Sequence, residues 1–424
     1  MPRAPPEGLA SPATDRAALV PFFQKKSIAV MEPTKSAVVD AWSCAVRDPR
    51  IDTLRGIFLV LMTVDHLPNH PLLRFTFQSF GFVSAAEGFV FVSGLVSGAV
   101  YGRILAKQGE ANLRRRAWHR ARDIYLTHVL LYTFALLGGL WGGLQIASRL
   151  PGLWTGWWHG ALLISQPPLF GILPMYAVFL LLTPLLLEQM ARGRALPIGA
   201  ASMALWLAAQ WGIGTPAHNP PWLQLGFFNI LAWQLLFVAG AFFGHRKAAG
   251  RGSPIPASRL LLVFSLVLAA MLFLVRHRLL FAGNLMRVDI PTALGAWRSI
   301  NHPLRLINFA AFAYIVWYAP RSIDKKLHGL SAFRFLRYLG QHSLQVFAWS
   351  TLVTYTAFSC RGSWASLPPV WRALLVVTAA LSLAIPAWLH QRWRLQKDKI
   401  SLTTAQADVP AEARFAAVIP NDIS

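Results

Sequence analysis

An arginine and a histidine lie eleven positions apart in one apolar stretch near the start of the chain, Arg55 and His66. On an α-helix this separation is three turns plus roughly 20° of rotation, with a rise of about 16 Å. Both side chains therefore lie on one face. An ionisable group in a membrane-spanning segment loses much of its hydration unless it faces a protein interior or a wet cavity, so such groups are functional candidates. The spacing predicts a polar face with a guanidinium at one end and an imidazole at the other.

The two residue types fit a group-transfer reaction. A histidine can act as general base on a hydroxyl. An arginine can bind a phosphate or carboxylate through its planar fork. Acyl-coenzyme A matches this pair, because its phosphates are about 15 to 20 Å from the acyl group, a length comparable to the rise along the helix.

A proton-coupled secondary transporter or flippase would use the same kinds of intramembrane residues, so it is the alternative. Transporters of this kind commonly contain inverted repeats or paired broken helices in corresponding halves. The sequence shows neither pattern. Binding of coenzyme A by the purified protein would separate the two classes.

Composition places the chain among integral membrane proteins. It has 424 residues, of which 55% are hydrophobic and only 13% are charged, whereas soluble domains carry about 25% charged residues. The net charge of +23 does not indicate a nucleic-acid partner, because the basic residues lie between apolar runs rather than in one patch. No His or Cys spacing suits a transition metal, so no metal site is expected.

Apolar segments of spanning length recur along the chain and predict an all-α, polytopic protein of about ten transmembrane helices. The basic residues between these segments gather on one side of the membrane, which places both termini in the cytoplasm. A mobile tail at 1–48 and a second tail at 393–424 flank the membrane domain at 49–392. The expected spans are 53–68, 82–103, 123–144, 169–188, 195–213, 227–244, 258–276, 303–319, 334–358 and 370–390.

Local features sharpen the first two spans. Pro68 should end the first helix soon after His66. Gly94 and Gly98 in the second span, with Gly102 one turn further on, predict a face that another backbone approaches closely. Glu87, near the outer start of the same span, has two interpretations: it orients or balances His66, or it is a buried carboxylate tied to a helix end or a neighbouring arginine.

Several motifs of the chain resemble the OpgC family of bacterial membrane proteins. The resemblance covers about residues 48–390, and the arginine and histidine of the first motif also resemble the signature of the wider acyltransferase-3 class. The motifs are RIDTLRGIFLVLMTVDH at 50–66, GFVSAAEGFVFVSG at 81–94, LPMY at 173–176, NILAWQLLF at 229–237, PLR at 303–305 and LGQHSLQVF at 339–347.

The resemblance implies a succinyltransferase that decorates osmoregulated periplasmic glucans and takes its acyl group from cytosolic succinyl-CoA. We therefore expect an inner-membrane O-acyltransferase with no bound cofactor, in which acyl-CoA is a co-substrate and a periplasmic glucan is the acceptor. His66 takes the proton of a sugar hydroxyl, Glu87 assists it, and Arg55 steadies the donor. Direct transfer and an acyl-histidine intermediate both remain open.

Further residues complete the predicted site. Arg305 and His342 are expected to line the donor path, and the basic segment 276–298 to help hold the glucan. Three tryptophans of the loop at 153–158 are expected to stack on sugar rings of the acceptor. These are Trp154, Trp157 and Trp158.

Overall fold

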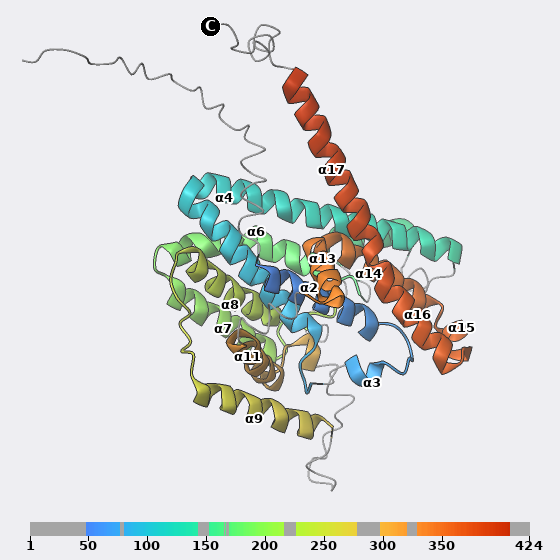
Figure 1. The fold of residues 1–424 in the computed structure, drawn as a ribbon, viewed down its shortest axis with the longest axis horizontal. Coiled ribbons are helices and arrows are strands. Elements are labelled where there is room, and N and C mark those ends of the chain that lie inside the picture. The colour runs from blue at the N-terminus through green and yellow to red at the C-terminus, as the bar shows by residue number, and fades with distance from the viewer. Residues whose placement is uncertain are drawn as a thin grey trace, which may run out of the picture. The chain divides into compact units, whose positions relative to one another are not determined.

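A computed structural model describes residues 48–76, 80–142, 152–164, 166, 169–215, 226–277, 297–319 and 329–407. These residues all belong to one compact unit, Asp48–Ser424. They form helices and connecting segments, with no strand among them, so the all-α prediction is confirmed for this part of the chain (Figure 1). The predicted tail at 1–48 lies outside the described residues except for its last one.

The helices follow the predicted apolar segments, with these differences. α4 covers both the second and the third predicted span and the connection between them, in which Gly109 is non-helical. The segment expected at 334–358 is divided at His342, and the one at 370–390 is divided at Leu383. The elements are α2 Pro49–Asp65, α3 Leu73–Thr76, α4 Ala85–Gly142, α5 Leu153–Ala161, α6 Ile172–Ala191, α7 Ala195–Gln210, α8 Ile230–Ala248, α9 Arg259–Arg276, α11 Pro303–Tyr318, α13 Ser331–Gln341, α14 Ser343–Ser359, α15 Arg361–Ser366, α16 Pro369–Ser382 and α17 Ala384–Ala407.

Four helical stretches within the described residues are long and apolar enough to cross a membrane: Ala85–Gly138, Ile172–Ala191, Arg259–Arg276 and Pro369–Lys397. The chain is thus a membrane protein by its helices, whereas the count of about ten spans and the cytoplasmic termini stay predictions. The basic connection expected between the second and third spans is itself helical and belongs to α4.

α2 ends close to where the sequence predicted and begins four residues before the predicted start at residue 53. The Asp48 side chain accepts a hydrogen bond from the backbone N–H of Arg50, and Pro49 is the first helical residue, where its missing N–H costs nothing. The helix ends at Asp65, with His66 as its C-cap and Pro68 two residues further on. The prediction that the helix breaks soon after His66 is confirmed.

The predicted close approach of the second span to another helix is also confirmed. A side-chain methyl at Gly94 would collide with the carbonyl of Phe237 in α8, and one at Gly98 would collide with the carbonyl of Ala241. Glycines 240 and 244 of α8 meet α4 in the same way. The pair is held by backbone-to-backbone packing of small residues, as in many membrane helix pairs.

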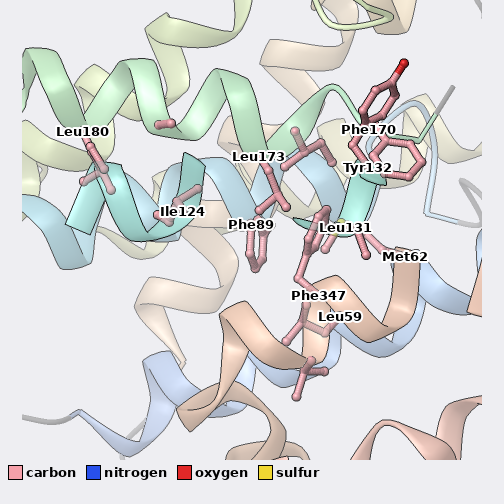
Figure 2. Close-up of a cluster of buried hydrophobic side chains, with 14 of the residues drawn as sticks. Leu59, Met62, Phe89, Ile124, Leu131, Tyr132, Phe170, Leu173, Leu180 and Phe347 are labelled. Carbon is pink, nitrogen blue, oxygen red and sulfur yellow. The ribbon is translucent and has the colours of Figure 1, made fainter. Parts of the chain in front are cut away.

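The main apolar core lies around the middle of α2. Leu59 and Met62 are buried there with Phe89 of α4 and Phe347 of α14 (Figure 2). The rings of Phe89 and Phe347 stack with centroids 5.9 Å apart. The length of α2 between Arg55 and His66 is therefore tightly packed against its neighbours.

α13 contacts α2 through two glycines, Gly56 and Gly340. A Cβ at Gly56 would collide with the carbonyl of Leu336, and a Cβ at Gly340 would collide with the carbonyl of Asp52. Both obstacles are backbone atoms, which cannot rotate away as a side chain can. These two glycines set the distance between α2 and α13.

We expect Gly340→Ala to lower the free energy of unfolding by about 3 kcal/mol or more, because the added methyl overpacks a backbone contact. Thermal unfolding of the detergent-solubilised chain measures the change. Gly199→Ala is the matched control, since Gly199 lies inside α7 with open space around it, and alanine is the better helix former. A Gly340→Ala variant as stable as Gly199→Ala would contradict the close approach.

Candidate active site

α2 carries Arg55 and His66 on one uninterrupted helix up to its C-cap. Both side chains are half-buried rather than sealed in the core. Because the helix is continuous between them, the separation of about 16 Å expected from the sequence holds.

The imidazole of His66 is held by its own helix. Its Nδ1 atom lies 2.6 Å from the carbonyl oxygen of Met62. A carbonyl can only accept, so Nδ1 carries the proton and donates it. The neutral ring then has an unprotonated Nε2, which is the form that a general base requires.

Arg55 lines a small pocket that is partly open to solvent. A second guanidinium, that of Arg120 from α4, lines the same pocket. Apolar and hydroxyl-bearing side chains form the remaining wall. They are Phe89, Ile172, Leu173, Tyr176, Ser343, Leu344 and Phe347. The pocket carries two positive charges and no carboxylate among these residues, so it suits an anion with an apolar or extended arm.

Arg120 was not predicted as a site residue, because it lies in the basic connection expected between the second and third spans. The helical spacing of apolar residues in this connection could have indicated it. Leu113, Ala117, Ala121 and Ile124 are all buried, and their intervals of four, four and three predict one inward face of a helix that continues through the basic segment.

His342 lies at the junction of α13 and α14, beside Ser343 of the pocket wall. Its Nδ1 atom lies 2.8 Å from Nδ1 of His390 on α17, so one ring donates and the other accepts. Tyr338 packs against His342 with ring centroids 5.2 Å apart. The place of His342 fits the predicted donor path, which stays a prediction; His390 was missed because it is 48 residues away.

Glu87 belongs to a capping box at the start of α4. One of its carboxylate oxygens accepts from the backbone N–H of Ser84 at 2.9 Å and from the Ser84 hydroxyl at 2.6 Å. The other accepts from the guanidinium of Arg305, and both partners are fully buried. The structure thus shows the contacts of the second interpretation, a carboxylate tied to a helix end and an arginine. A role of Glu87 toward His66 stays a prediction.

Arg305 and His342 lie in different parts of the structure, although both were predicted to bind the donor. Arg305 contacts the start of α4, whereas His342 contacts α17. Asn308, one turn after Arg305, accepts from the backbone N–H groups of Phe82 at 2.7 Å and Val83 at 3.1 Å. α11 therefore fixes the turn that leads into α4.

His302 caps the first turn of α11 next to Arg305. Its Nδ1 accepts from the backbone N–H of Leu304 at 3.3 Å, and its ring stacks on Trp297 with centroids 4.4 Å apart. Burial and the positive charge of Arg305 lower the pKa of His302, which keeps this ring neutral as an acceptor.

The three tryptophans predicted to bind the acceptor lie on a helix, α5, and not in a loop. Their rings contact one another, with centroids 4.8 to 6.0 Å apart. Trp154 is 70% exposed and Trp158 is 42% exposed, whereas Trp157 donates from Nε1 to the Thr133 hydroxyl at 2.8 Å. They form an exposed aromatic surface anchored to α4.

α5 is held on α4 by hydroxyl groups that bind its backbone. Tyr132 donates to the carbonyl of Gly156 at 2.9 Å, and Tyr125 donates to the carbonyl of Ala161 at 2.8 Å.

Among the described residues, no cluster of three or more histidine, cysteine, aspartate or glutamate side chains could hold a metal ion.

Comparison with known proteins gives one match. Residues 47–395 fit the family model described as OpgC protein. The searches of curated proteins and of solved structures find no match.

Proposed function

The chain belongs to the OpgC family, and from this premise we propose that it is an O-acyltransferase of the bacterial inner membrane. It moves an acyl group, succinyl from succinyl-CoA, onto hydroxyls of periplasmic glucans. The observation that carries the proposal is α2 itself. This helix has an imidazole with an available Nε2 at one end and a pocket with two guanidinium groups at the other.

His66 acts on the acceptor hydroxyl. As the hydroxyl oxygen attacks the thioester carbonyl carbon, its proton passes to Nε2 of His66. The tetrahedral intermediate collapses, the carbon–sulfur bond breaks, and the leaving thiolate takes the proton from the imidazolium. The Met62 carbonyl keeps Nδ1 protonated throughout and fixes the ring. In the alternative route Nε2 attacks the thioester first and an acyl-histidine transfers the group to the hydroxyl.

Arg55 and Arg120 bind the phosphates of the donor, and the apolar wall of the pocket receives its arm. His342 borders this pocket through Ser343. Phe89 and Phe347 belong to the wall of this pocket, and both are buried in one apolar cluster with Leu59 of α2 (Figure 2).

The aromatic surface of α5 offers stacking faces for the sugar rings of the glucan. Trp154 and Trp158 expose their rings, and aromatic rings bind the apolar faces of sugars through their apolar area. Of the basic segment 276–298, only residues 276–277 at the end of α9 and residues 297–298 belong to the described part of the chain.

The proposal is tested by the ester content of glucans from cells with and without the gene, measured by mass spectrometry. We expect succinyl esters to disappear from the periplasmic glucan when the gene is removed and to return with the full chain. An unchanged ester content would overturn the proposal. A protein that moves glucan without esterifying it would instead be the transporter of the alternative.

We expect Arg55→Ala to weaken binding of coenzyme A by about 10- to 100-fold, because a charge-assisted hydrogen bond contributes about 1.5 to 3 kcal/mol. Titration calorimetry on the detergent-solubilised chain measures the dissociation constant. Arg55→Lys keeps the positive charge but loses the planar guanidinium, so its affinity for coenzyme A should lie between those of the wild type and Arg55→Ala. Arg115→Gln is the control, because Arg115 is exposed on α4 and bonds to Asn112 outside the pocket.

A further inference from the structure

α11 presents buried hydrogen-bond donors that have no acceptor. Nε and Nη1 of Arg305 and Nδ2 of Asn308 are buried, and within the described part of the chain nothing accepts from them. Both residues are 0% exposed and lie on one face, three positions apart. Most buried polar atoms in native proteins are paired, so such a group of donors indicates an acceptor that is bound there.

Glu87 does not supply this acceptor. One of its oxygens is taken by Ser84 and the other by Arg305 Nη2. Asn308 likewise uses its oxygen for the backbone of Phe82 and Val83. What remains on this face of α11 is three N–H-bearing atoms and no free oxygen. This chemistry suits an oxyanion such as a carboxylate.

Arg298 brings a second guanidinium to the same place. Its positive charge acts on Arg305 and Glu87, and also on Asp65 and His66 at the end of α2. The side chain of Arg298 is half-buried, and its guanidinium lies over the ring of Phe227, with Cζ 5.4 Å from the ring centroid. An anion bound between the two guanidinium groups would lie next to the proposed general base.

The turn that carries Arg298 is clamped in position. The carbonyl oxygens of residues 298–301 all accept hydrogen bonds from side chains of α7 and α8. Trp233 donates to the first two, at 3.1 and 3.0 Å, Gln210 to the third at 2.8 Å, and Trp206 to the fourth at 3.0 Å. Two tryptophans and a glutamine thus fix the backbone of Arg298, which is how a preorganised binding residue is supported.

We propose that Arg298, Arg305 and Asn308 bind a carboxylate at the far end of the donor's acyl group, so that the site selects a dicarboxylic acyl chain. The inference rests on the proposed acyl transfer at His66. With the thioester carbonyl at His66, the distal carboxylate of a four-carbon acyl group is three carbon–carbon bonds away, toward Arg298. Asp65 is the other carboxylate near Arg298, and its Oδ1 atom is buried without a hydrogen-bond partner among the described residues.

The test compares two donors on the full chain in detergent with a glucan acceptor. We measure kcat/KM for succinyl-CoA and for acetyl-CoA, which lacks the carboxylate. The wild type should prefer succinyl-CoA, and Arg298→Gln should lower the succinyl-to-acetyl ratio by about tenfold or more, because a site built to bind a polar group discriminates strongly. Arg298→Lys should lower the ratio less, since it keeps the charge. Arg372→Gln, which touches the Asn69 carbonyl after α2 and not this cluster, should leave the ratio unchanged.

Equal losses with both donors in Arg298→Gln would overturn the inference, because they would mean that Arg298 only supports Asp65 and the end of α2. An unchanged ratio would overturn it as well. A wild type that prefers acetyl-CoA would remove the carboxylate site and leave acyl transfer standing. A wild type that uses neither donor would remove the proposed function itself.

Discussion

Replacing His66 with alanine lowers the rate of ester transfer by about a thousandfold, since general base catalysis is typically worth 10² to 10⁴. The loss is expected although the fold is kept, because His66 lies at the C-cap of α2 and is half-buried. The only described hydrogen bond of its imidazole is to the Met62 carbonyl of its own helix. Ester content of the glucan in cells, together with the transfer rate of the purified chain, measures the effect.

His119→Ala is the control for His66→Ala, because His119 is an exposed histidine of α4. Its ester content should equal that of the wild type. Normal ester content in a His66→Ala strain would eliminate the mechanism even if the chain is an acyltransferase. Labelled donor given without acceptor separates the two routes, since only an acyl-histidine route leaves label on the wild type and none on His66→Ala.

The end of α2 and the positions of its polar residues were predicted from the sequence because their causes are local, whereas the helix begins four residues before the predicted start. Asp48, Pro49 and Pro68 determine where the helix begins and ends through capping and through the missing proline N–H. The spacing of Arg55 and His66 follows from helix geometry alone. The small-residue face of the second span was predictable for the same reason, although its partner, α8, was not.

The contacts of the candidate site could not be predicted, because they join residues distant in the sequence. Glu87 and Arg305 are 218 positions apart, and no local pattern links them. Arg120 looked like a loop charge, since basic residues near a span are typical of cytoplasmic connections. In the structure these residues continue a helix, and packing against α6 and α14 gives Arg120 a pocket.

The segment with the three tryptophans was wrongly predicted to be a loop. The segment 153–158 was predicted to be a loop because it lies in the connection between the predicted spans 123–144 and 169–188. The structure has a helix there, because tertiary hydrogen bonds from Tyr132 and Tyr125 hold the backbone of α5 on α4. Such contacts exist only in the folded chain.

The Glu87–Arg305 ion pair should produce the largest stability effect in the described part of the chain. We expect Glu87→Gln and Arg305→Met each to lower the free energy of unfolding by about 3 to 5 kcal/mol, because each leaves the other charge buried without its partner. The double variant should be more stable than the sum of the two losses predicts, by about 1 to 3 kcal/mol, because it leaves no unpaired charge. Thermal unfolding in detergent gives the three values.

The exposed ion pair of Arg192 and Glu110 is the control for these single and double variants. Its atoms are 3.0 Å apart, with side chains 52% and 46% exposed, so Arg192→Gln should change stability by less than about 1 kcal/mol. Additive losses of stability in the Glu87 and Arg305 variants would contradict an energetic coupling between the two residues.

The same variants also test catalysis. Glu87→Gln keeps an oxygen that can accept from Ser84, so the chain can remain folded while the charge is lost. If Glu87→Gln folds but transfers neither succinyl nor acetyl groups, whereas Arg305→Met folds and still transfers acetyl groups, which need no carboxylate site, then the Glu87 carboxylate serves His66 as well as the start of α4.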